Sequence, residues 1–285
     1  MINQNIAWLS DIHLDFLDKA RRRAFYQTLL DAGVDGVVIS GDICNGNYLE
    51  AFLTEMAKIM KVPIWFTLGN HDYYGSNVKA IRKKLKALCI KQPLLQWLHQ
   101  EGVVALSEEI GLVGVDSWAD GRAGHYWEST VELADHRLIG DLKGLDAAGR
   151  LKVIQGFANE AEEILRRSLA CALDQFKTVF VVSHVPMYYE ACLGPDRRVS
   201  GSMWMPHYVW HQGGVAIGEV LQNHSQGRMI VLSGHTHSDI RLRIDDRISI
   251  WVAPAEYDNP SISEVIDLSR YGSKNALVQS SPTSV

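Results

Sequence analysis

The sequence predicts an α/β fold in which a mainly parallel sheet carries a second sheet packed against it. In the first half of the chain, short apolar runs of strand length alternate with segments of helical periodicity, an order typical of parallel sheets. In the second half, strand-like segments follow one another around 241–254 with little helix between them. This difference between the two halves indicates the second sheet.

The expected strands are short runs rich in β-branched and aromatic residues, and each run ends in polar residues. They are IAWLS (6–10), GVVIS (36–40), IWFTL (64–68), LVGV (112–115), TVFVVS (178–183) and MIVLS (229–233), with further strands around RLRI (241–244) and ISIWVAP (248–254). Periodicity alone leaves short buried helices open as an alternative for such runs.

Two segments show the apolar spacing of an amphipathic helix. In 48–60, Phe52 and Met56 lie on one face, and Asn47 precedes the segment as a candidate N-cap. In 151–169, apolar residues recur at helical spacing, and most of the charged residues of EAEEILRR fall on the other side. Both segments are therefore predicted to pack one face on a sheet.

The composition is that of a soluble globular protein, with 47% hydrophobic and 21% charged residues among 285. A net charge of −5 argues against general binding to nucleic acids or anionic membranes. No signal-peptide pattern and no apolar run of membrane-spanning length is visible, so we expect a cytoplasmic protein. Wide spacing favours reduced thiols over disulfides or a thiolate zinc site for the four cysteines, which are Cys44, Cys89, Cys171 and Cys192.

We expect one domain over 1–275 and a loose tail over 276–285, because no internal repeat and no linker rich in proline, glycine or serine divides the chain. The tail ends in SSPTSV, a polar stretch without periodicity.

Polar residues with metal-ligand or acid–base chemistry follow five of the expected strands. They are Asp11 and His13, Asp42, Asn70 with His71 and Asp72, His184, and His235 with His237. Taken singly, each fits a structural role, because aspartate is a common turn residue and a lone histidine near a strand end is usually structural. Because ligands bind outside the carboxyl ends of strands in α/β sheets, we expect the whole set to converge on one site.

The chemistry of this set favours a metal centre. Carboxylate, amide and imidazole donors without a thiolate suit borderline to hard divalent or trivalent cations. Asp11 and His13 are two residues apart, as are His235 and His237, and in an extended strand end that spacing would place both side chains on one side. Two such pairs indicate two cations, with a carboxylate such as Asp42 between them.

The ordered set D-x-H, G-D, G-N-H-D, a lone H and G-H-x-H resembles the calcineurin-like metallophosphoesterases, over residues 11 to 237. The resemblance implies a four-layer αββα sandwich, two mixed β-sheets flanked by helices, with a dinuclear metal site at the strand ends. It implies two divalent or trivalent transition-metal ions, with Mn, Fe and Zn all found in the family. The implied ligands are Asp11, His13 and His237 for one ion, Asn70, His184 and His235 for the other, and Asp42 bridging both.

The resemblance also implies that His71 is the catalytic histidine and that Asp72 is the carboxylate that orients it. The expected reaction is in-line attack of a metal-bound hydroxide on a phosphate ester, with His71 protonating the leaving oxygen. The expected substrate is a small-molecule phosphate ester, and diesters, monoesters and nucleotide pyrophosphates remain open. A non-catalytic scaffold of the same fold is the competing class, although such proteins usually lose ligands and none is missing here.

Two stretches, near 116–170 and 186–213, are expected to be insertions that border the site, with aromatic residues that could contact substrate. A loop that packs on its own aromatic residues is the alternative. The G-D motif here continues as ICNGN, without the arginine that follows it in the protein serine/threonine phosphatases. A monoester dianion favours arginine, so we predict a phosphodiester preference, with cyclic nucleotides as candidates. Arg122, Arg197 and Arg198 could replace the missing arginine.

Overall fold

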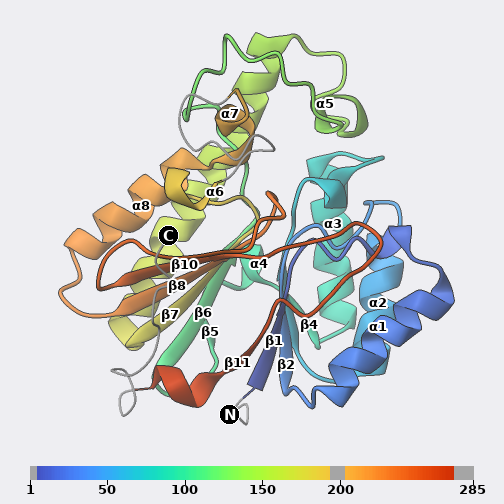
Figure 1. The fold of residues 1–285 in the computed structure, drawn as a ribbon, viewed down its shortest axis with the longest axis vertical. Coiled ribbons are helices and arrows are strands. Elements are labelled where there is room, and N and C mark those ends of the chain that lie inside the picture. The colour runs from blue at the N-terminus through green and yellow to red at the C-terminus, as the bar shows by residue number, and fades with distance from the viewer. Residues whose placement is uncertain (1–4, 193–202, 273–285) are drawn as a thin grey trace.

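The computed structural model describes residues 5–192 and 203–272. Within these ranges the strands form two sheets that pack face to face, and helices cover the outer side of each sheet (Figure 1). The predicted four-layer arrangement of two mixed sheets between helices is confirmed. The predicted tail over 276–285 lies outside the described residues.

The first sheet has the order β11-β1-β2-β3-β4. Its strands are β11 (Glu264–Asp267), β1 (Asn5–Leu9), β2 (Gly36–Ser40), β3 (Ile64–Thr67) and β4 (Leu95–Trp97). Strands β1 to β4 are parallel, and β11 closes the edge antiparallel to β1. Its helices are α1 (Lys19–Asp31), α2 (Leu49–Met60) and α3 (Val78–Lys91), which lie on one face of the sheet (Figure 1).

The second sheet has the order β5-β6-β7-β8-β10-β9. Its strands are β5 (Val104–Ala105), β6 (Ile110–Val115), β7 (Thr178–Ser183), β8 (Arg228–Ser233), β10 (Ile248–Val252) and β9 (Ile240–Arg243). The four inner strands are parallel, and the two edge strands are antiparallel to them. Helices α6 (Ala147–Gln175) and α8 (His211–Gln222) cover its outer face (Figure 1).

Side chains alternate between two buried environments along the central strands. In β1, Trp8 belongs to the cluster between the sheets, whereas Leu9 packs with the residues on the helix side. In β7, Phe180 likewise belongs to the cluster between the sheets, and Val181 packs on the helix side. Because both faces of each sheet are covered, these strands are apolar along their whole length, which explains why they appear as continuous apolar runs in the sequence.

Both predicted helices form, but their ends differ from those predicted. The segment predicted over 151–169 extends over 147–175 as α6, and the Asp146 side chain caps it by accepting a hydrogen bond of 2.7 Å from the Gly149 N–H. The predicted cap of α2 is wrong, because Tyr48 occupies the N-cap position and no side chain in the described ranges caps this helix. In the described part of the chain, no helix combines the length and the apolar character needed to cross a membrane.

The remaining short helices lie in the connections. They are α4 (Leu98–Glu101), α5 (Asp135–Leu138), α7 (Met205–Tyr208), η1 (Leu14–Phe16), η2 (His71–Tyr73), η3 (Tyr189–Ala191) and η4 (Leu268–Tyr271). Both α5 and α7 lie beyond the ends of the sheets, at the top of Figure 1, beside the first turns of α6. The stretches predicted to be insertions supply these two helices.

Candidate metal centre

The structure brings all nine predicted site residues together at the carboxyl ends of five strands. Asp11 and His13 follow β1, Asp42 follows β2, and Asn70, His71 and Asp72 follow β3 in the first sheet; His184 follows β7, and His235 and His237 follow β8 in the second. The two sheets therefore contribute to the site from opposite sides.

The backbone of these loops is strained at several of the candidate ligands. Among the described residues other than glycine, positive φ angles occur at Lys61 and at five site residues, namely Asp11 (50°), His13 (39°), Asp42 (50°), His235 (68°) and His237 (51°). The predicted extended conformation of each pair is thus wrong, although Asp11 and His13 still place ligand atoms within 4.8 Å of each other. The strands end at Leu9 and Ser233, and left-handed residues turn the chain after them. Such strain persists where the surrounding structure fixes it, and it concentrates at functional sites.

Two glycines let these loops approach closely. A Cβ atom at Gly69 would overlap the carboxylate of Asp42, and one at Gly234 would overlap the carboxylate of Asp11. Because a carboxylate occupies the space that a side chain would need, the residue before Asn70 and the residue before His235 must each be glycine. This requirement gives the G-N-H-D and G-H-x-H motifs a physical reason.

Three ligand-type atoms form a small triangle at the centre of the site. The Oδ1 atom of Asn70 lies 3.1 Å from Nε2 of His184 and 3.1 Å from Nδ1 of His235, and the two nitrogens are 3.2 Å apart. The opposite ring nitrogens have other partners. Nδ1 of His184 lies 3.0 Å from the carbonyl of Ser40, and Nε2 of His235 lies 3.0 Å from the carbonyl of His207.

All three atoms of the triangle are hydrogen-bond acceptors. A backbone carbonyl only accepts, so the nitrogens that face carbonyls carry the protons and the nitrogens of the triangle are bare in neutral rings. Burial lowers the pKa of His184 and lowers that of His235 to about 4, so both imidazoles are neutral at pH 7. Three lone pairs that point at one another repel, and a cation between them removes the repulsion. The triangle therefore fits a metal ion.

A second group of ligand atoms lies beside the triangle. Asp11, His13 and His237 each place one ligand atom within 4.8 Å of the others, and Nε2 of His237 is 3.3 Å from Oδ1 of Asp11. His13 is fully buried, yet neither of its ring nitrogens has a hydrogen-bond partner in the described structure. Burial lowers the pKa of this imidazole to about 3, so it is neutral and available as a ligand.

Asp42 lies between the two groups. Its Oδ2 atom is 3.5 Å from Nε2 of His184 and 4.0 Å from Nε2 of His13, while Oδ1 accepts a hydrogen bond from the His71 N–H at 2.9 Å. Burial raises the pKa of this carboxyl well above its ordinary value, and the nearby carboxylates of Asp11 and Asp72 raise it further. The position is one from which a carboxylate can contact two cations.

The imidazole of His71 faces this carboxylate and is enclosed by aromatic rings. Its Nε2 atom is 3.9 Å from Oδ2 of Asp42, and its ring stacks on Tyr74 with centroids 4.2 Å apart. Burial lowers its pKa to about 4, and among nearby charges Asp135 opposes this most strongly. The group is therefore positioned beside the candidate cations without belonging to the triangle.

The hydrogen bonds described for Asp72 do not include the His71 ring. Its carboxylate instead accepts hydrogen bonds from the N–H groups of Ile43, Cys44 and Gly69, at 2.9 to 3.0 Å. Burial raises the pKa of this carboxyl to about 8. The residue thus joins the loop after β2 to the loop after β3, and it positions Asp42 and Asn70 through the backbone.

Sequence reasoning missed two residues that hold the site in place. Oδ1 of Asp135, in α5, accepts hydrogen bonds from the Asn70 amide at 2.9 Å and from the Tyr74 hydroxyl at 2.6 Å. Because the amide nitrogen of Asn70 donates to this carboxylate, its oxygen faces the triangle. Tyr257, half exposed, lies with its ring centroid 4.6 Å from that of His13 and 5.1 Å from that of His237. Neither residue follows a strand motif, so nothing in the sequence pattern identified it.

The chain belongs to the calcineurin-like phosphoesterase family, because the sequence model of that family matches residues 4–239. Members of this family are phosphoric ester hydrolases with dinuclear metal sites, and the Asp and His clusters described above are able to bind metal ions.

Solved structures share the fold. The phosphopantetheinyl hydrolase from Mycobacterium tuberculosis is similar with a TM-score of 0.62 and 12% identity, over 90% of this chain and 92% of that one. A dimetal phosphatase from Danio rerio has a TM-score of 0.53 and 15% identity, over 88% and 87% of the two chains. The protein TT1561 of Thermus thermophilus has a TM-score of 0.53 and 14% identity, over 94% and 96%. No curated protein sequence matches this chain significantly.

Substituting Asp135 should weaken the metal site at the triangle. In Asp135→Ala the Asn70 amide loses the carboxylate that fixes its orientation, so we expect one of the two Mn²⁺ sites to bind about 10–100-fold less tightly and the other to keep its affinity. Calorimetric titration of chelator-treated protein with Mn²⁺ measures this change. Asp141→Ala is the matched control, since that carboxylate lies in the same segment and bonds the Val78 N–H of α3. Equal losses in both variants would contradict the role of Asp135.

Asp42→Asn should stabilise the metal-free fold at alkaline pH. The raised pKa of Asp42 means that the metal-free folded state binds the proton more tightly than the unfolded state, so stability falls as pH rises above the unfolded value near 4. Each unit of that shift corresponds to about 1.4 kcal/mol. Thermal unfolding in chelator at pH 5 and pH 8 should show a smaller decline for the variant, with a higher melting temperature than wild type at pH 8. A lower melting temperature at pH 8 would contradict this account.

Proposed function

We propose that this chain is a dinuclear metal-dependent phosphoesterase that prefers phosphodiesters. The observation that carries the proposal is the triangle of three acceptor atoms, 3.1–3.2 Å apart, beside the buried imidazole of His13, which has no hydrogen-bond partner among the described residues. One cation would be held by Asn70, His184 and His235, and the other by Asp11, His13 and His237. The carboxylate of Asp42 lies where it can bind both.

Two cations so held supply Lewis acidity toward a phosphoryl oxygen and an activated water near neutral pH. The donors are imidazole nitrogens and carboxylate or amide oxygens, which suit Mn, Fe or Zn. The full set of donors favours an enzyme over a non-catalytic scaffold of the same fold.

His71 is the proposed proton donor to the leaving oxygen. Water adds to phosphorus and releases a proton, the bond between phosphorus and the leaving oxygen breaks, and that oxygen takes a proton from His71. The His71 ring stacks on Tyr74, and its Nε2 atom lies 3.9 Å from Oδ2 of Asp42. Although burial lowers its pKa to about 4, a bound anionic ester would raise it toward the working range. We propose that Asp72 acts by fixing the loops that carry Asp42 and His71.

The charge distribution around the site supports a diester preference. No arginine or lysine is among the described residues that line the pocket beside Asn70 and His235. The guanidinium of Arg122 is bound by Asp120 at 3.2 Å and by Asn159 at 2.9 Å. The other two candidate arginines, Arg197 and Arg198, lie outside the described residues. A monoester dianion would thus lack the bidentate arginine that such groups favour, whereas a diester carries a single charge.

We also propose that the enzyme is cytoplasmic and acts on a small-molecule ester. All four cysteines are free thiols, as expected in a reducing compartment. The net charge of −5 does not favour polyanionic partners.

Hydrolysis should require metal and favour diesters. Strong chelation should abolish activity, and Mn²⁺ should restore it. The kcat/KM for bis(p-nitrophenyl) phosphate should exceed that for p-nitrophenyl phosphate, and Arg122→Gln should leave their ratio unchanged because Arg122 is engaged elsewhere. Full activity without metal would exclude the mechanism, and a tenfold preference for the monoester would exclude the diester assignment.

His71→Ala should separate proton donation from metal binding. The variant should keep its metal content and lose about 10²–10⁴-fold in rate on a diester with a poor leaving group such as an alkyl alcohol. The loss should be small on a nitrophenyl ester, whose leaving group needs no proton. Rates and metal content measured on the same preparations test this. Loss of a metal ion, or equal loss on both esters, would instead make His71 a ligand, consistent with its place in a cluster with His13 and Asp42.

A further inference from the structure

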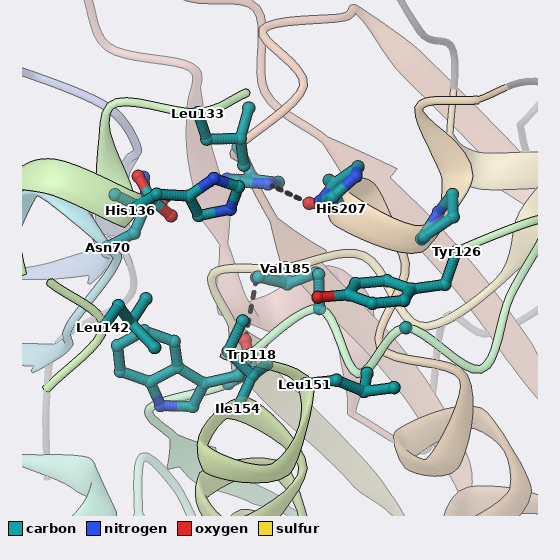
Figure 2. A pocket seen from close by; sticks show the side chains of 16 residues that line it. Asn70, Trp118, Tyr126, Leu133, His136, Leu142, Leu151, Ile154, Val185 and His207 are labelled. Carbon is teal, nitrogen blue, oxygen red and sulfur yellow. Dashed lines mark hydrogen bonds between the residues drawn. The ribbon is translucent and has the colours of Figure 1, made fainter. Parts of the chain in front are cut away.

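A largely apolar pocket opens beside the candidate metal centre. It spans about 490 Å³ of empty space, part of which is open to solvent. Asn70 and His235, two members of the acceptor triangle, line it. Most of its wall is apolar and includes Trp118, Leu133, Leu142, Leu151, Ile154 and Pro206. In Figure 2, Asn70 and His136 face Trp118 and Ile154 across this space.

Most polar side chains in the wall already have partners within the protein, although the indole N–H of Trp118 has none among the described residues. The partners are the carbonyl of Ala147 for the Tyr126 hydroxyl, Glu132 for Nδ1 of His136, Ser129 for Nε2 of His207, and Asn70 with Tyr74 for Asp135. A polar occupant would therefore lose its hydrogen bonds to water and gain few new ones from the protein.

The charge of the wall also restricts the occupant. Among the described residues that line the pocket, Asp135 is the only acidic side chain, and no lysine or arginine is present. A second anionic group would meet a carboxylate and an apolar wall, and burying it unpaired would be costly. An uncharged apolar group would instead exchange water for Trp118, Leu151 and Ile154.

We infer that this pocket binds one ester substituent of the substrate, and that this substituent is uncharged and predominantly apolar, an alkyl or aryl group. The inference rests on the proposed phosphoesterase function, because the phosphate at Asn70 and His235 directs the substituent into the pocket. It excludes substrates that would place a second phosphate or a carboxylate there.

A series of 4-nitrophenyl alkyl phosphodiesters, from methyl to pentyl, tests the inference on the Mn²⁺-loaded wild-type protein. Because nitrophenolate is the common leaving group, only the alkyl substituent varies. We expect kcat/KM to rise about threefold per methylene over the first few carbons, the effect of burying each group. A carboxylate at the end of the chain should lower kcat/KM about tenfold relative to the alkyl ester of equal length.

Leu151→Lys introduces a positive charge into the wall. Leu151 is half-buried on α6, and the lysine should abolish the preference for longer alkyl groups and raise kcat/KM for the carboxylate-terminated ester above that for the alkyl ester. Ala148→Lys is the matched control, because Ala148 is exposed one turn earlier on α6 and does not line the pocket. This control should keep the wild-type order of substrates.

The outcomes separate the inference from the function on which it rests. Hydrolysis of every ester at similar kcat/KM would overturn the pocket assignment and leave the phosphoesterase proposal standing. A carboxylate-terminated ester that equals its alkyl counterpart in the wild-type protein would also overturn the assignment. Hydrolysis of p-nitrophenyl phosphate without hydrolysis of any diester would overturn the diester proposal and the inference together.

Discussion

The repulsion among three hydrogen-bond acceptors is the interaction around which this site is organised. Asn70, His184 and His235 come from loops after three different strands, and each has its remaining polar atom bound by the protein scaffold. The carbonyls of Ser40 and His207 fix the two imidazole tautomers, and Asp135 fixes the amide. The scaffold therefore holds the lone pairs at one point before any cation is present, at a cost that a cation would remove.

The same constraint explains the unusual backbone of the loops. A strand that continued straight would carry Asp11 and His13 past the site, so the chain turns through left-handed conformations directly after β1. Glycines at 69 and 234 remove the Cβ atoms that would block the carboxylates. The buried carboxylate of Asp72 then ties two of the loops together through three backbone N–H groups. Strain, close approach and buried charge thus occur in one small volume, as expected of a functional site.

Much of this arrangement could be predicted from the sequence because it depends on local patterns, namely apolar runs of strand length and the polar residues that follow them. The central strands are buried on both faces, so runs such as GVVIS and TVFVVS predicted β2 and β7 at their observed bounds. The site residues follow strand ends directly, and parallel strands bring those ends to one edge. The helix ends were harder to predict, since α6 begins four residues before its predicted start and, among the described residues, no side chain caps α2. Asp135, Tyr257 and the two carbonyls could not be found, because tertiary packing alone brings them to the site and a carbonyl has no sequence signature.

The division of the candidate ligands between the two sheets has a mechanical consequence. Asp11, His13, Asp42 and Asn70 belong to the first sheet, and His184, His235 and His237 belong to the second. Apart from this edge, the sheets are held face to face by apolar packing around residues such as Trp8 and Phe180. Bound cations would act as cross-links between the layers and close a chain loop from residue 11 to residue 237, much as a disulfide does. Loss of the cations would then allow the two layers to separate more easily at this edge than at the opposite one, where apolar packing is joined by a hydrogen bond from the Thr178 hydroxyl to the Tyr271 carbonyl.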